Sequence, residues 1–164
     1  MLRSSARRRA AALLASASLV GLLAAGLPSA AQAAPPVHLK LGPSTYEFDN
    51  VCTFPLRYEE TVNKETLTVF VNGKAIVSGS YKVTLTNLTT GATLVVKASG
   101  PQFFDGSATV TESGPQIFVL FPGDVMGPGV YLLEGRITAT RDATGTTINI
   151  TNTGTTSHNL CNSL

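Results

Sequence analysis

The best-placed carboxylate pair in the sequence is Glu47 and Asp49, which stand two residues apart. Residues i and i+2 of a strand project from the same face of a sheet, so both carboxylates would point the same way. Their oxygens are ligands that suit Ca²⁺, with Asp105 or Asp124 as a further donor. Charged side chains usually face water, however, and we favour that interpretation. We therefore predict no metal site and no cofactor.

Nucleophilic and glycosidase chemistry find no support in the residue spacing. The two histidines, His38 and His158, stand near no nucleophile motif, and the G-x-S-x-G elbow is absent. Glu59 and Glu60 are adjacent, so a strand would point them to opposite faces, which does not suit an acid–base couple. We predict no catalytic residue and a non-enzymatic protein. The alternatives are a small secreted hydrolase that uses the carboxylate pair described above, or a protease inhibitor.

The segment from Phe121 to Val130 is the most suggestive binding element, because it is irregular and holds three Gly and two Pro around two apolar residues. Loops on a rigid scaffold often carry function, and exposed apolar side chains can mark a partner site. Phe121, Asp124, Val125 and Met126 are therefore the candidate partner-binding residues, and the partner would be an unidentified protein or cell-surface component. In the alternative that we weigh more heavily, Val125 and Met126 fold back and cap one end of the domain.

The first 33 residues have the order of a secretory signal peptide. Arg3 and Arg7 to Arg9 form a basic head, residues 10–27 are uncharged and mostly apolar, and Ala31-Gln32-Ala33 matches an A-x-A cleavage site. We predict cleavage after Ala33, with the bond after Ala34 as the near alternative and an uncleaved anchor as the less favoured one. A Sec signal is favoured over a twin-arginine signal, which the run of arginines would also allow. The mature chain, 34–164, should be one secreted domain without a membrane span.

Cleavage changes the charge of the protein. The whole chain has 12 Lys and Arg against 10 Asp and Glu, but four of the arginines lie in the predicted signal, which leaves eight basic residues and a net charge of −2. These eight are scattered and form no basic stripe that could follow a phosphate backbone. We therefore predict that the protein does not bind nucleic acid.

Two cysteines, Cys52 and Cys161, remain in the mature chain. An even pair in an exported protein indicates a disulfide, although two buried thiols are the alternative. A disulfide between them would close a loop of more than 100 residues, which stabilises the fold by about 4–5 kcal/mol in the chain-entropy model. It would also hold the C-terminal tail against the start of the domain.

The rest of the sequence predicts β-structure, because Thr, Val, Ile, Phe and Tyr dominate it and alternate with polar residues. Tyr81, Val83 and Leu85 alternate in this way, and Asn72-Gly73 predicts a two-residue hairpin turn. Gln116 to Phe121 is instead apolar at successive positions, which indicates a central strand covered on both faces or a strand beside an extra apolar loop. We count eight to ten short strands and predict an all-β antiparallel sandwich, immunoglobulin-like or jelly-roll-like, with a small β-barrel as the alternative.

Two stretches carry a resemblance, Gly79 to Pro101 (GSYKVTLTNLTTGATLVVKASGP) and Phe118 to Arg136 (FVLFPGDVMGPGVYLLEGR). Together with the Ala- and Arg-rich leader and the late cysteine, they resemble uncharacterised small secreted β-rich proteins of high-GC actinobacteria. The resemblance implies export and β architecture. It carries over no functional residue, because the shared features are turns and strands.

Overall fold

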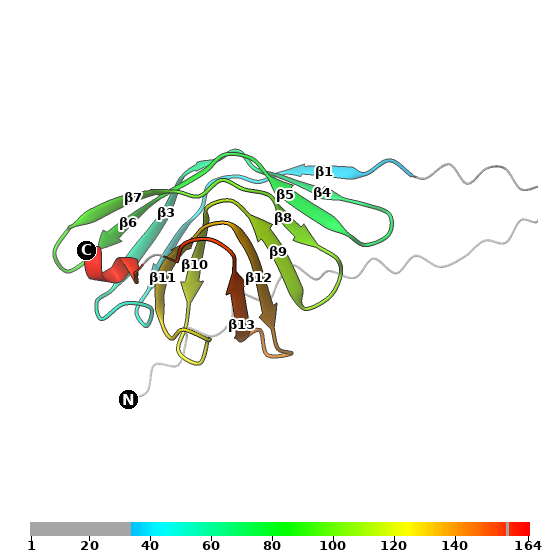
Figure 1. The fold of residues 1–164 in the computed structure, drawn as a ribbon. Coiled ribbons are helices and arrows are strands. Elements are labelled where there is room, and N and C mark those ends of the chain that lie inside the picture. The colour runs from blue at the N-terminus through cyan, green and yellow to red at the C-terminus, as the bar shows by residue number, and fades with distance from the viewer. Residues whose placement is uncertain (1–33, 157) are drawn as a thin grey trace, which may run out of the picture. The chain divides into compact units, whose positions relative to one another are not determined.

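The computed structural model describes residues 34–156 and 158–164, so the predicted signal peptide, 1–33, lies outside the described residues (Figure 1). All the paired strands run antiparallel. The largest sheet has the order β1 (Val37–Lys40), β4 (Thr66–Val69), β5 (Ala75–Ser78), β8 (Gln102–Phe104), β9 (Thr109–Ser113), β12 (Arg136–Arg141) and β13 (Thr147–Asn152).

A four-stranded sheet and a hairpin complete the fold. The four-stranded sheet has the order β2 (Thr45–Phe48), β3 (Leu56–Asn63), β6 (Tyr81–Asn87) and β7 (Thr93–Lys97), and the hairpin pairs β10 (Gln116–Leu120) with β11 (Gly129–Leu133). One turn of 3₁₀ helix, η1 (Leu160–Ser163), ends the chain. The predicted all-β antiparallel sandwich is confirmed. Both large sheets keep open edges, so the described strands do not close into a barrel. They number thirteen rather than eight to ten, because β1, β2 and β8 are too short for an alternation pattern to reveal.

The chain passes between sheets at tight corners, as in sandwiches whose strands switch sheets by bending. β3 leads into β4, β5 into β6, and β11 into β12 with only two residues between the strands. Hydrogen bonds continue across the bends, for example from Lys64 N to Ser80 O at 2.9 Å. Gly135 shows why small residues stand here, since its φ is 101° and a Cβ would lie 2.7 Å from the nitrogen of Gly154.

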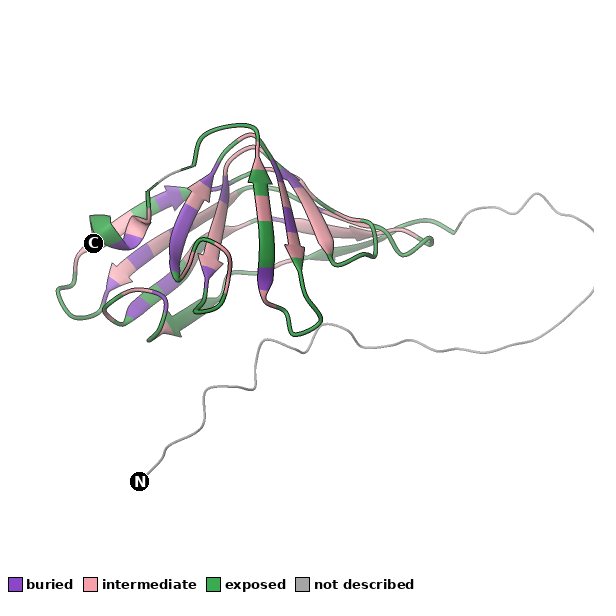
Figure 2. Ribbon diagram, turned by 60° about the horizontal axis from the view of Figure 1, so that its bottom comes forward, coloured by how far each residue is buried: buried purple, intermediate pink, exposed green. Residues whose placement is uncertain are grey.

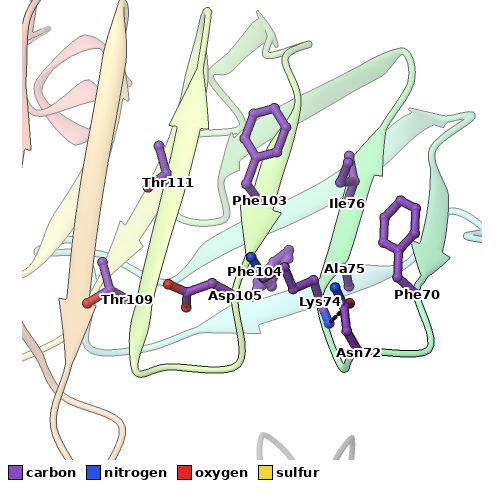
Figure 3. A pocket seen from close by; sticks show the side chains of 10 residues that line it. All are labelled: Phe70, Asn72, Lys74, Ala75, Ile76, Phe103, Phe104, Asp105, Thr109 and Thr111. Carbon is purple, nitrogen blue, oxygen red and sulfur yellow. Dashed lines mark hydrogen bonds between the residues drawn. The ribbon is translucent and has the colours of Figure 1, made fainter.

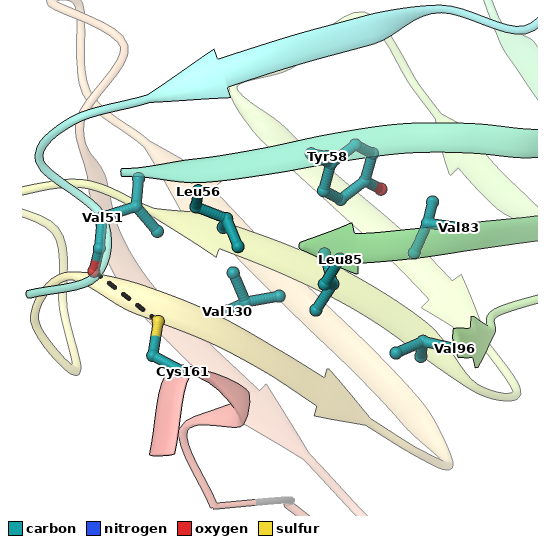
Figure 4. Close-up of a cluster of buried hydrophobic side chains, with 8 residues drawn as sticks. All are labelled: Val51, Leu56, Tyr58, Val83, Leu85, Val96, Val130 and Cys161. Carbon is teal, nitrogen blue, oxygen red and sulfur yellow. Dashed lines mark hydrogen bonds between the residues drawn. The ribbon is translucent and has the colours of Figure 1, made fainter. Parts of the chain in front are cut away.

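The β10–β11 hairpin lies between two groups of buried side chains. Side chains alternate along each strand, so Ile117 and Val130 belong to one group, whereas Leu120 and Leu133 belong to the other. The first group includes buried residues of β3, β6 and β7 (Figure 4), and the second includes Ile137 of β12. The apolar residues of β10 therefore have partners on both sides, which confirms the predicted two-sided strand.

The predicted alternation in β6 is confirmed, because Val83 and Leu85 are fully buried while the residues between them are less so. Figure 2 shows the buried residues (purple) along the strands and mostly exposed residues (green) in the connecting loops. The hairpin at Asn72-Gly73 is also confirmed, but its predicted two-residue turn is wrong. Phe70 N donates to Lys74 O and Gly73 N donates to Phe70 O, so three residues form the loop and only Gly73 has positive φ, at 79°. A type I turn followed by a left-handed glycine is the other common hairpin connection.

Candidate functional site

The predicted carboxylate pair, Glu47 and Asp49, does not lie on one strand. Glu47 lies on β2, where its Oε1 accepts hydrogen bonds from Arg57 Nε at 3.0 Å and Nη2 at 2.9 Å. Asp49 follows the end of the strand, so the shared strand face on which the pairing depended is absent. No three His, Cys, Asp or Glu side chains gather in a metal-binding group within the described part of the chain. The Glu47–Arg57 ion pair is exposed and contributes little to stability.

Asp124 is the centre of the Phe121–Val130 loop. Its Oδ2 accepts the backbone N–H of Phe121, and its Oδ1 accepts that of Thr147 in β13, both at 2.6 Å. Charge-assisted bonds of this kind are stronger than bonds between neutral groups. Val125 N donates to Thr147 O at 2.7 Å, so a second bond ties the loop to the same residue. Asp124 therefore holds the loop in one shape.

Met126 has an uncommon backbone conformation. Its φ is 73°, and it is the only non-glycine among the described residues with positive φ. That conformation costs a residue with a Cβ roughly 1–2 kcal/mol. The hydroxyl of Tyr131 donates to Met126 O at 3.1 Å and fixes the strained peptide, while the Met126 side chain remains 43% exposed. Strain of this kind is common at functional positions.

Phe121 begins the loop, and its ring lies against Phe48 of the edge strand β2. The centroid of Phe121 lies 5.6 Å from that of Phe48 with the planes at 73°, and Phe48 stacks on Tyr46 at 6.2 Å and 15°. These distances are typical of favourable aromatic pairs. Phe121 and Tyr46 are 40% and 47% exposed. We call Tyr46, Phe48, Phe121 and Met126 the loop surface. The alternative prediction was that Val125 and Met126 fold back and cap one end of the domain. Val125 is half-buried, whereas Met126 is exposed.

The C-terminal tail fastens the other end of this loop. The predicted disulfide between Cys52 and Cys161 is confirmed. Next to it, Asn159 Oδ1 accepts the N–H of Val130 at 3.2 Å, and Asn159 Nδ2 donates to Pro128 O at 3.2 Å. The same Oδ1 accepts the N–H of Cys161 at 3.1 Å and begins the 3₁₀ turn. The disulfide thus stabilises the tail that holds the loop.

A cleft lies on the largest sheet, and none of its lining residues belongs to the Phe121–Val130 loop. It has a volume of about 420 Å³ and lies on strands β4, β5, β8 and β9 (Figure 3). Phe103, Ile76 and Phe70 project from the sheet in the same direction, and most of the polar side chains of the cleft lie nearer the hairpin ends of the strands. The lining residues are Phe70, Asn72, Lys74, Ala75, Ile76, Phe103, Phe104, Asp105, Thr109 and Thr111.

Polar groups in the interior form a third feature. The hydroxyls of Tyr58 and Tyr81 lie 2.8 Å apart, and Tyr81 donates to Glu60 Oε1 at 3.0 Å. Burial raises the pKa of both tyrosines, so the hydroxyls stay protonated. Burial also raises the pKa of Glu65, with the charge of Glu60 as a smaller cause.

Glu112 on β9 is the most perturbed carboxyl. It is 8% exposed, and its Oε2 has no hydrogen-bond partner. Burial raises its pKa to about 7, against the opposing effect of Arg141. Glu112 lines neither the cleft on the largest sheet nor a second, open cleft around Glu59 and Glu60.

Sequence reasoning missed both the cleft and the buried carboxyl. Phe103, Ile76 and Thr111 lie side by side only because β8 pairs with β5 and β9, and their separation in the sequence hides this row. Glu112 stands in Thr-Val-Thr-Glu-Ser, where alternation alone could have placed it on the same face as Val110.

Comparison with known proteins gives this site no precedent. No helix of the described residues is long and apolar enough to cross a bilayer. No protein-family model, curated protein or solved structure matches the chain.

Proposed function

We propose that this protein is exported, cleaved after Ala33, and acts outside the cell as a non-enzymatic module that binds a protein or other component of the cell surface. The observation that carries the proposal is the loop surface, where exposed apolar side chains stand on a backbone fixed by Asp124, Tyr131 and Asn159. A preformed surface binds with a smaller entropy cost than a flexible one. Aromatic residues and Met are also enriched at protein interfaces.

The disulfide supports the location. Disulfides such as the bond between Cys52 and Cys161 form and persist in oxidising compartments and are rare in reducing ones. The leader sequence of residues 1–33 points to the same route. The net charge of −2 that the cleaved chain would carry favours neither nucleic acid nor an anionic membrane as the partner.

The position of Glu112 favours binding over hydrolysis. A carboxyl with a pKa near 7 could serve as a general acid, but it must reach a substrate. Glu112 is only 8% exposed and lines neither of the two clefts described above. Its raised pKa is therefore explained by burial in the packed interior.

The test follows the protein in the organism that encodes it. Wild type, the double variant Phe121→Ser/Met126→Ser and the control Val95→Ser are each expressed at native level, and medium and washed envelopes are compared by immunoblot. Val95 is 58% exposed on β7, distant in sequence from the loop. We expect wild type and control in the envelope fraction, with a mature N-terminus at Ala34, and the double variant in the medium. Wild type found only inside the cell or only in the medium, or retention of the double variant, would contradict the proposal.

A further inference from the structure

The cleft on the largest sheet is built from side chains alone. Its floor is formed by β4, β5, β8 and β9, each of which pairs with a strand on both sides. Their backbone donors and acceptors are therefore used in the sheet. An extended peptide that adds a strand to a sheet needs a free edge, and this floor has none. A ligand here must be held by ring faces, hydroxyls and the charged tips around them.

Two rows of side chains cross the strands. In the first, Thr111, Phe103 and Ile76 are direct cross-strand neighbours. In the second, Lys74 pairs with Phe70 at the end of the β4–β5 hairpin. Figure 3 shows Phe103, Ile76 and Phe70 projecting in the same direction, with Thr111 level with Phe103. Asp105, Lys74 and Asn72 lie together nearer the hairpin ends of the strands. Phe103 is 42% exposed although it lies on an interior strand.

Several polar groups of the cleft are available to a ligand. Asn72 Oδ1 accepts the N–H of Lys74, and Asp105 Oδ1 accepts that of Ser107, which orients both side chains. The ammonium of Lys74 forms no ion pair within the described residues. The rim therefore offers an amide, an ammonium, a carboxylate and the hydroxyl of Thr111 beside the rings.

We propose that this cleft binds a neutral polysaccharide, with sugar rings stacked on Phe103 and Phe70 and sugar hydroxyls bonded to Thr111, Asn72 and Lys74. A sugar ring has an apolar face of C–H groups and a rim of hydroxyls, and the negative face of an aromatic ring attracts C–H groups. The cleft likewise places the apolar side chains of Phe103, Ile76 and Phe70 near polar side chains, which are those of Thr111, Asn72, Lys74 and Asp105. Its volume of about 420 Å³ falls within the usual range for small-molecule sites.

The charges of the cleft argue against anionic ligands. Lys74 is its single cation, and the carboxylate of Asp105 lies in the same lining. Phosphate-rich ligands are bound by several Lys or Arg side chains together. Uncharged hydroxyls can instead donate to Asp105 and accept from Lys74, so both charges are satisfied by one neutral chain.

The test is native electrophoresis of the purified mature protein in gels that contain hydroxyethyl cellulose, xylan, laminarin or dextran. We expect at least one of these neutral polymers to slow wild type in a concentration-dependent way. Phe103→Ala should weaken that binding by about tenfold, which corresponds to the loss of one aromatic contact. Thr111→Val, which keeps the side-chain shape, should weaken it less, and the exposed control Val95→Ala should not change it.

Three outcomes would overturn the proposal. The first is free migration in all four polymers, and the second is equal retardation of wild type and Phe103→Ala. The third is a dimer of wild type in light scattering that Phe103→Ala dissociates, which would assign the cleft to a second copy of the chain. Thermal melting of each variant shows that it is folded. The loop-surface variant should be retarded like wild type, so failure here and failure of envelope binding are separate results.

Discussion

Asp124 binds the backbone of Thr147, because its Oδ1 accepts the N–H of Thr147 at 2.6 Å. The neighbouring Val125 N donates to Thr147 O at 2.7 Å, so both backbone groups of Thr147 bind the loop. Thr147 is buried at the start of β13, so the loop is bound to a strand rather than to another loop. This arrangement keeps the apolar side chains of the loop surface exposed without giving the backbone freedom to bury them.

Asp124→Asn should loosen the loop. The amide offers one acceptor oxygen in place of two, so either Phe121 N or Thr147 N loses its partner, at a cost of about 1–3 kcal/mol. Hydrogen exchange should be faster at whichever of Phe121 N and Thr147 N loses its acceptor, and urea unfolding should give a lower free energy of unfolding. Asp49→Asn, at an exposed position outside any strand, serves as the control. Unchanged exchange at both Phe121 and Thr147 in Asp124→Asn would show that the carboxylate does not hold the loop.

Met126→Gly should increase stability while it removes a binding side chain. Glycine adopts a φ of 73° without the steric cost that Met pays, and the gain after the larger unfolded-state entropy of glycine is about 0.5–1 kcal/mol. Val125→Gly is the matched control, because Val125 has no positive φ and should lose stability. Denaturant midpoints of the two variants measure the difference. Equal destabilisation of both would contradict the strain at Met126.

Removal of the disulfide should cost about 4–5 kcal/mol in the free energy of unfolding, because the bond restricts a very long loop of the unfolded chain. The residues it links are 109 positions apart. The variant Cys52→Ser/Cys161→Ser should show this loss in guanidinium unfolding without reductant. Wild type treated with reductant should show the same loss of stability as the double variant. Hydrogen exchange at Val130 N should also be faster in the variant, because the tail that carries its acceptor, Asn159, is held less firmly. A loss below 1 kcal/mol would be inconsistent with the entropic account.

Glu112 should make the protein less stable as pH rises. Its pKa is about 7 in the folded state and near the ordinary value of 4.5 in the unfolded state, so between these values the folded chain binds the extra proton. Stability from this group is thus fully present below pH 4.5 and is lost as pH rises through 7, by on the order of 3 kcal/mol. The raised pKa of Glu65 acts in the same direction.

Glu112→Gln should flatten this dependence, because the neutral amide fits the buried site at every pH. We expect the variant to match wild type at pH 4.5 and to exceed its melting temperature at pH 8. Glu59→Gln, at an exposed position, is the control and should follow wild type throughout. A wild-type melting temperature that rises steadily from pH 5 to pH 8, with no gain in Glu112→Gln, would contradict the assignment.

Local pattern in the sequence was enough for the strands that alternate or that have two apolar faces. Val83 and Leu85 show the first kind, and Ile117 with Leu120 shows the second. The disulfide also followed from the number of cysteines and the compartment. The turn at Asn72-Gly73 was assigned one residue too short, because the same dipeptide fits both two-residue and three-residue loops.

The candidate sites depend on pairing that no local pattern contains. Phe103 meets Ile76 through the β5–β8 pairing, and Phe121, in the loop after β10, meets Phe48 of β2. The role of Asp124 depends on Thr147, 23 residues later in the chain. Glu47 and Asp49 were paired by spacing, but β2 ends between them and the geometry disappears.

The most direct measurement of the binding role is a titration of washed envelopes, isolated from the organism that encodes the chain, with fluorescently labelled mature protein. We expect saturable binding for wild type and for Val95→Ser, and an affinity at least about tenfold lower for Phe121→Ser/Met126→Ser, because its two exposed apolar side chains are lost. Non-saturable binding of wild type, or equal isotherms for wild type and the double variant, would contradict the assignment of the loop surface as the binding site.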